Sequence, residues 1–321
     1  MINSVRQTVM SVLNKNNYGY ISPSDFNLFA KQAQLDMFEN YFYQYNYQLV
    51  KENARHSGTG YADITKGLEE TIDYFSVTLP LTNSSFNKYF LPSDTTTGTD
   101  YYLINKLLIY RSELVTGSTT SFIVAGDTII DATKDFIALG ISNGDIVGVA
   151  AGGVTYNMTV ISVLSATQIL VNTGGDDIFD AAPIVYHIYS SSFIKEAEKV
   201  THSKITMLNN SLLTAPTLTY PAYTQEDLLA TAFPSTVDGI GQVVAQYIRY
   251  PYIPKWTYVS IGSGEPIFDA SQPDYQDFEL PIGDEVNLVN KILQYAGMSI
   301  REIEVANFGN TEDNEDNTQK R

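Results

Sequence analysis

The sequence predicts an α+β protein, a mixed helical and β scaffold that carries an inserted small all-β barrel. Apolar side chains recur at helical spacing near the start of the chain, and helical and extended patterns return near its end. Between them, residues 116–190 are rich in Val, Ile, Thr and Gly and contain no Glu or Arg. We therefore expect a discontinuous scaffold domain (1–115 and 191–305), an inserted barrel (116–190) and an acidic tail (306–321) without a fold of its own.

The chain is expected to begin with a short amphipathic helix, followed by a long one. Ile2, Val5, Val9 and Val12 lie at three- and four-residue spacing in the first. The second begins with Ser22 as N-cap, Pro23 in the first helical position and Asp25 three residues after the cap. Nothing interrupts its pattern before about residue 55, which predicts a helix of roughly 30 residues, about 45–50 Å long.

The long helix is apolar on two faces, whereas a surface helix usually shows one apolar stripe. One seam contains Phe26, Phe29, Ala30, Ala33 and Met37, and the other contains Leu35, Phe38, Phe42, Tyr45 and Leu49. Two interpretations follow. The helix is either buried at the centre of its own domain, or it packs on its own core by one seam and on a neighbouring subunit by the other.

The remaining scaffold alternates between helical and extended patterns. We expect helices at 61–75, 193–211 and 285–296, and extended segments at 77–81, 89–92, 101–110, 242–250 and 256–261. Proline confines the first two extended segments to sheet edges or strand ends. Gly297 is expected to cap the final helix.

The pattern of the insert predicts short strands separated by turns. We expect strands at 121–124, 128–131, 145–150, 155–163, 168–171 and 184–189. Long strand edges in so small a unit must be paired or covered, which favours a closed barrel.

The composition and motifs of the chain exclude several kinds of catalytic and metal-binding site. The chain has no Cys, which removes disulfides, thiolate metal sites and cysteine nucleophiles, and its three His residues fit no metal motif. Phosphate-loop, dinucleotide-binding and nucleophile-elbow motifs are missing from the sequence. Two acidic groups, one at Asp176, Asp177 and Asp180 and one at Asp274, Asp277 and Glu279, lack the spacing of a calcium loop and read as solvated turns. We expect no catalytic residue, no cofactor and no metal, and we predict that the protein is not an enzyme.

Short segments at both ends of the chain carry a resemblance. They are Asn3-Ser4-Val5-Arg6-Gln7-Thr8-Val9, Asn17-Tyr18-Gly19-Tyr20-Ile21-Ser22-Pro23, Phe26-Asn27-Leu28-Phe29, Tyr247-Ile248-Arg249-Tyr250-Pro251, Pro254-Lys255-Trp256-Thr257-Tyr258, Asp277-Phe278-Glu279-Leu280-Pro281 and Gly297-Met298-Ser299-Ile300-Arg301. Together they resemble virion proteins of crAss-like tailed bacteriophages.

The resemblance implies a ring or connector protein of a short-tailed phage, stacked below the portal. As a homo-oligomer of about twelve copies, matching the portal, it would extend the DNA channel and dock the portal protein and neighbouring tail proteins. A net charge of −17 suits a channel that DNA crosses without specific binding. We expect the protein in the virion tail, made in the host cytoplasm and not in a membrane.

Aromatic and arginine side chains dominate interface energetics, which selects candidates for the ring contacts. They are Phe38, Phe42, Tyr45, Arg249, Tyr250, Tyr252 and Trp256. An alternative for Trp256 is that it and Tyr258 fill the core of a sheet. The alternative function is a receptor- or glycan-binding tail protein that uses the β insert as its binding head, and a cell-envelope hydrolase is a third reading.

Overall fold

The computed structural model describes residues 1–14, 21–55, 64–111, 113–118, 121–123, 127–151, 154–173, 184–192, 194–260 and 266–300. The predicted acidic tail and the Asp176–Asp177–Asp180 turn lie outside these residues. The chain forms two compact units. We call Met1–Phe75 with Tyr250–Arg321 the helical unit and Ser76–Arg249 the β unit.

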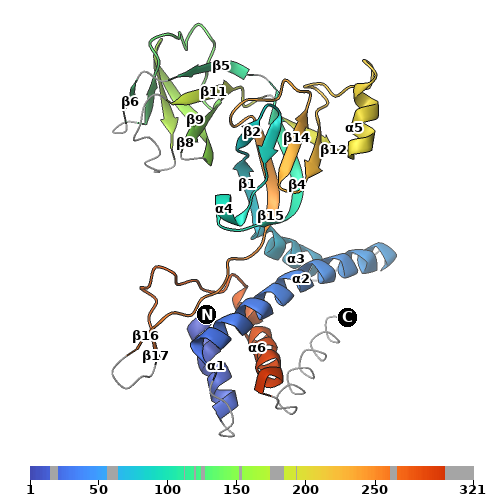
Figure 1. The fold of residues 1–321 in the computed structure, drawn as a ribbon, viewed down its shortest axis with the longest axis vertical. Coiled ribbons are helices and arrows are strands. Elements are labelled where there is room, and N and C mark those ends of the chain that lie inside the picture. The colour runs from blue at the N-terminus through green and yellow to red at the C-terminus, as the bar shows by residue number, and fades with distance from the viewer. Residues whose placement is uncertain are drawn as a thin grey trace. The chain divides into compact units, whose positions relative to one another are not determined.

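The helical unit contains the expected helices at both ends of the chain (Figure 1). Its elements are α1 (Ile2–Asn14), α2 (Pro23–Arg55), α3 (Ile64–Asp73), the strands β16 (Tyr258–Ser260) and β17 (Pro266–Phe268), the 3₁₀ turn η2 (Ile282–Asp284) and α6 (Glu285–Ile300). The start predicted for α2 is confirmed, since the backbone N–H of Asp25 donates to Ser22 Oγ at 3.1 Å.

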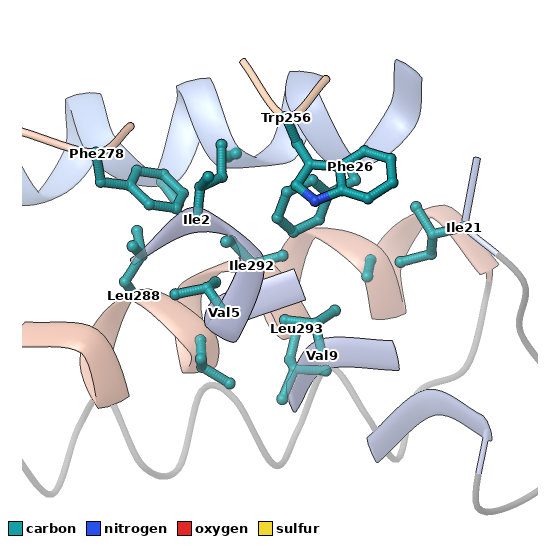
Figure 2. Close-up of a cluster of buried hydrophobic side chains, with 14 of the residues drawn as sticks. Ile2, Val5, Val9, Ile21, Phe26, Trp256, Phe278, Leu288, Ile292 and Leu293 are labelled. Atoms are coloured by element: carbon teal, nitrogen blue, oxygen red, sulfur yellow. The ribbon is translucent and has the colours of Figure 1, made fainter. Parts of the chain in front are cut away.

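The core of the helical unit lies where α1, the first half of α2 and α6 meet (Figure 2). Ile2, Val5 and Val9 of α1 are fully buried, as their spacing predicts, but Leu13 continues this face and Val12 is 38% exposed. Trp256 and Phe278, from the segment between the β unit and α6, close the cluster. The final helix therefore buries an apolar face against segments far away in sequence.

The β unit contains an eight-stranded mixed sheet with the order β1-β15-β4-β12-β13-β14-β3-β2. Its strands are β1 (Ser76–Pro80), β2 (Asn83–Ser85), β3 (Lys88–Phe90), β4 (Tyr101–Tyr110), β12 (Ile194–Lys199), β13 (Ala222–Glu226), β14 (Leu229–Phe233) and β15 (Val243–Arg249). Two short helices, α4 (Asp94–Thr97) and α5 (His202–Asn209), connect them. β1 ends in Pro80 and forms one edge, as proline requires.

The insert forms a curled antiparallel sheet with the order β5-β11-β8-β9-β10-β7-β6. Its strands are β5 (Glu113–Ser118), β6 (Ser121–Ile123), β7 (Thr128–Ile130), β8 (Ile146–Ala151), β9 (Val154–Ser165), β10 (Gln168–Asn172) and β11 (Val185–Tyr189). All six predicted strands are present, and β5 is a seventh that the prediction missed. The fold class, α+β with a barrel-like β insert, is confirmed.

Two predicted helix features are wrong. Residues 193–211 were expected to be one helix, but 194–199 form β12, which pairs with β4 and β13, and only α5 is helical. Gly297 was expected to end the last helix, but α6 continues through it to Ile300. In residues 194–199, a helix propensity of about 1 kcal/mol per residue or less is overridden by the strand pairing of β12 with β4 and β13.

The boundaries of the compact units differ from those of the predicted domains. The division falls after Phe75 and after Arg249. The strands of the eight-stranded sheet lie within residues 76–110 and 194–249, which were predicted to share a scaffold with the helices but group with the insert in the β unit. The cause is strand pairing, since β4 hydrogen-bonds with β15 and β12, while the helices bury their own separate core.

Candidate interaction surface

The candidate surface is built on α2, whose two halves have different surroundings. The first half packs on α1 and α6 through residues such as Phe26, Ala30 and Ala33. The second half extends away from these helices and is accompanied by α3 (Figure 1). A helix of this length spans about 50 Å, more than its partners in the core can cover.

An aromatic cluster fixes the middle of α2. Phe38 is fully buried and its ring lies 5.0 Å from that of Phe42, 5.0 Å from that of Phe75 and 5.8 Å from that of Tyr250. The first two contacts are edge-to-face, the arrangement that the charge distribution of aromatic rings favours. Further along, the hydroxyl of Tyr45 donates to Glu69 at 2.8 Å and ties α2 to α3.

Tyr41 joins α2 to the segment before α6. Its hydroxyl donates to Asp284 Oδ2 at 2.6 Å. Burial, and then the hydrogen bond and charge of Asp284, raise the pKa of Tyr41 well above its ordinary value. The phenol therefore stays neutral and keeps donating. The same pattern recurs at Tyr295, whose hydroxyl donates to Asp36 of α2.

Opposite these contacts, the second half of α2 carries an exposed apolar stripe. Tyr43, Tyr47 and Val50 follow one another at spacings of four and three residues, so they share one face of the helix. Tyr43 is 65% exposed and Val50 68%, and Tyr47 and its neighbour Leu49 are also exposed. We call Tyr43, Tyr47 and Val50 the α2 stripe. Neither predicted seam includes these three residues; their spacing is visible in the sequence, but their exposure is not.

The predicted interface residues on α2 and at residue 250 belong to the interior of the helical unit. Phe38 has no exposed surface, so it is a core residue and not an interface residue. Phe42 and Tyr250 are half-buried in the same aromatic cluster, and Tyr45 is half-buried and donates to Glu69. Contact of these three with a partner stays a prediction.

Trp256 is buried in the core of the helical unit, so it is a core residue, as the alternative expected, and not an interface residue; this core is formed mainly by helices and not by a sheet. It is 2% exposed, the guanidinium of Arg6 lies 3.8 Å from its ring centroid, and the ring of Phe268 stacks on it with the centroids 5.9 Å apart. Its indole N–H donates to Asn3 Oδ1 at 3.1 Å, and its backbone N–H donates to Asn27 Oδ1 at 2.8 Å. Hydrogen bonding and packing together make it an anchor between α1 and α2.

Arg249 and Tyr252 are close in sequence but belong to different units. Arg249 is the last residue of β15 and half-buried in the β unit. Tyr252 belongs to the helical unit and is 36% exposed, with its backbone N–H donating to Glu279 at 2.7 Å. Of the seven candidates, Tyr252 presents the most exposed side chain, and its role at an interface stays a prediction.

The acidic group at 274–279 is used for internal contacts. Asp274 pairs with Lys255, Glu279 accepts from Tyr252, and Asp277 accepts from the amino group of Met1 at 2.9 Å. Burial would raise the pKa of Asp277, but hydrogen bonds from Met1 and from two backbone N–H groups hold that pKa below its usual value. Within the described ranges, no group of three or more His, Asp or Glu side chains is placed to hold a metal ion.

The described ranges contain helices of up to 33 residues. None of their helices combines the length and the apolar character that crossing a bilayer requires. Comparison of the chain with protein-family models and with curated proteins gave no match.

Proposed function

We propose that this protein is a structural subunit of a ring in the portal–tail region of a short-tailed phage virion. In this role it extends the DNA channel and docks neighbouring tail proteins. The α2 stripe is the observation that carries the proposal. The resemblance of both ends of the chain to crAss-like virion proteins indicates which kind of particle the subunit belongs to and where in that particle it lies.

The stripe supports an assembling subunit because it has the composition of an interface. Tyrosine is enriched at interfaces, since its ring contributes apolar area while its hydroxyl can still bond to a partner. Tyr43 and Tyr47 lie on a helix whose opposite face is already fixed by Tyr41 and the Phe38 cluster. The surface is therefore rigid before a partner arrives, which lowers the entropic cost of association.

The net charge of the chain is consistent with a subunit that surrounds a DNA channel. A net charge of −17 repels the phosphates of DNA, and a protein that binds DNA by its backbone needs the opposite sign. Subunits of a channel must let DNA slide, so weak attraction is an advantage.

Negative-stain electron microscopy tests the proposal. The purified protein is imaged alone and mixed with its portal protein, and closed rings are expected in at least the mixed sample. A Tyr43→Lys/Tyr47→Lys variant is expected to lose the rings while keeping its far-UV circular dichroism, since both side chains are exposed and Lys is a good helix former. The matched control is Leu28→Lys, at a 63% exposed position in the first half of the same helix, which is expected to form rings as the wild type does.

Two outcomes would contradict the proposal at different points. Monomers in both wild-type samples, without portal binding, would overturn the ring function and favour the receptor- or glycan-binding alternative. Normal rings from the double lysine variant would leave the function standing but remove the α2 stripe as its carrier.

A further inference from the structure

An aromatic residue occupies a strained position at the tip of the hairpin formed by β2 and β3. The two strands are joined by a two-residue loop, Phe86-Asn87, which lies between the paired residues Ser85 and Lys88. Of the two loop residues only Phe86 has a positive φ, 46°. A first loop residue of this conformation is normally glycine, because a Cβ there crowds the neighbouring carbonyl oxygen. Phe86 therefore stands where its own side chain makes the backbone unfavourable.

Phe86 differs from every other described residue with a positive φ. The others are glycines and two aspartates, Asp127 and Asp227. Aspartate tolerates this region because its short side chain can bond to the local backbone, whereas a bulky residue is an outlier there. Phe86 is also 85% exposed, so burial of the ring does not offset the strain. Single exposed apolar residues are ordinary, but one that is also strained points to a role outside the folding of its own chain.

Hydrogen bonds hold the hairpin tip in place. Asn83 Nδ2 donates to the carbonyl of Phe86 at 2.7 Å and to the carbonyl of Asp238 at 3.2 Å. Asn87 Nδ2 donates to the carbonyl of Ala232 at 2.6 Å, and the backbone N–H of Ala232 donates to the carbonyl of Asn87 at 2.8 Å. The ring of Phe86 is therefore presented on a backbone that is fixed before a partner arrives, which lowers the entropic cost of binding.

The charges around the tip indicate the chemistry of the partner. Lys88 lies 4.0 Å from Glu226, so these two charges offset each other. Asp238 is exposed, and in the part of the chain that the structure describes it pairs with no cation. The complementary surface is an apolar pocket with Lys or Arg at its rim. A second copy is a poor source of such a rim, because it carries −17 and several of its lysines already pair with carboxylates of their own chain.

The same tip is poorly suited to a lipid surface. Segments that bind membranes usually combine several apolar side chains with Lys or Arg that attract anionic headgroups. Here the loop presents a single ring beside polar Ser85 and Asn87, and the charge next to it, on Asp238, is negative. A protein pocket is therefore the better partner.

We propose that Phe86 is an anchor that inserts into an apolar pocket with a basic rim on a different protein, the neighbour of this subunit in the stack. This contact rests on the proposed function and supplies a residue for the docking of neighbouring proteins. It is separate from the α2 stripe, since the stripe belongs to the helical unit and Phe86 to the β unit. Aromatic side chains that fill a partner's pocket carry much of the binding energy of an interface.

A substitution that relieves the strain separates binding from folding. Phe86→Asn introduces a residue that adopts positive φ more readily, so the midpoint of thermal unfolding is expected to rise by about 2–4 °C. Its affinity for the neighbouring protein is expected to fall by roughly thirtyfold or more, as when an aromatic hot spot is removed. A residue with only a structural role would not give a variant that is more stable and binds more weakly.

Affinity is measured by biolayer interferometry, with the full-length protein in solution and each neighbour in turn on the sensor, the portal protein and the tail protein below the ring. The matched control is Ile137→Asn, at a 64% exposed position without positive φ, which is expected to bind as the wild type does and to gain no stability. Phe86→Trp keeps an aromatic anchor and is expected to retain most of the affinity. Asp238→Lys is expected to weaken binding, because it places a cation opposite the basic rim.

The anchor and the ring function fail in different ways. If the wild type forms rings but binds neither neighbour, or if Phe86→Asn binds as tightly as the wild type, the anchor is wrong and the ring function stands. An equal loss of binding in Ile137→Asn also overturns the anchor, because the effect is then not specific to Phe86. If the wild type forms no rings and binds neither neighbour, the ring function fails and this contact with it.

Three further results would contradict individual steps. An unchanged or lower unfolding midpoint in Phe86→Asn would disprove the strain. Unchanged binding by Asp238→Lys would disprove the basic rim. Flotation of the wild type, but not of Phe86→Asn, with vesicles of phosphatidylcholine and phosphatidylglycerol would show that the ring enters lipid and would overturn the protein partner.

Discussion

Replacing Trp256 with Ala separates a core role from an interface role. The side chain is 2% exposed, and deletion of a buried aromatic ring costs about 3–5 kcal/mol. The loss of the hydrogen bond to Asn3 and of the contact with Arg6 adds about 1 kcal/mol. We therefore expect the free energy of unfolding of the helical unit to fall by about 4–6 kcal/mol, a large part of the usual total of about 5–15 kcal/mol.

The assay is urea denaturation followed by far-UV circular dichroism, at a concentration where the wild type is monomeric so that assembly does not contribute. Trp256→Phe serves as the graded control. It keeps an aromatic ring that can contact Arg6 and Phe268 but loses the indole N–H, and is expected to cost about 1–2 kcal/mol. A change below about 1 kcal/mol in Trp256→Ala, together with a loss of assembly, would refute the core role and restore Trp256 as an interface residue.

Three further predictions concern stability. Tyr186→Phe removes the 2.6 Å hydrogen bond to the buried carboxylate of Asp131, and thermal denaturation is expected to show a loss of about 1–3 kcal/mol, whereas an unchanged midpoint would contradict it. Gly148→Ala would place a Cβ 2.3 Å from the carbonyl oxygen of Ile240, so a loss of about 1–3 kcal/mol is expected in the same assay, and wild-type stability would disprove the close approach. The pKa of Asp277 is lowered on folding, so its stabilising effect is present above the usual carboxyl pKa of about 3.9 and is lost as the pH falls through the folded-state value. Asp277→Asn is expected to flatten this acid dependence, and an unchanged pH profile of unfolding would count against it.

Local patterns in the sequence determined where most elements begin and what type they are. The cap formed by Ser22 and Pro23 places the start of α2, and the Val- and Thr-rich insert forms all six strands expected of it. These predictions succeed because capping, turn formation and side-chain periodicity depend on residues close together in the chain. The α+β class follows from the same information.

Contacts between distant segments were decided only by the tertiary structure. Residues 194–199 have a helical apolar pattern but form β12, because β4 and β13 offer partners on both sides. Trp256 lies in the core because α1 supplies Asn3 and Arg6, residues more than two hundred positions away.

The tertiary structure also decided which apolar side chains remain exposed. The sequence shows that Tyr43 and Tyr47 share a helix face and that Leu212 and Leu213 adjoin a turn, but it does not show whether other segments cover them. The fold leaves all four exposed, because α1 and α6 pack only on the first half of α2 and the turn after α5 directs its leucines outward. Burial is a property of the whole packed chain, so the local sequence determined most of the helices and strands, while the tertiary structure decided which of their apolar faces remained available to partners.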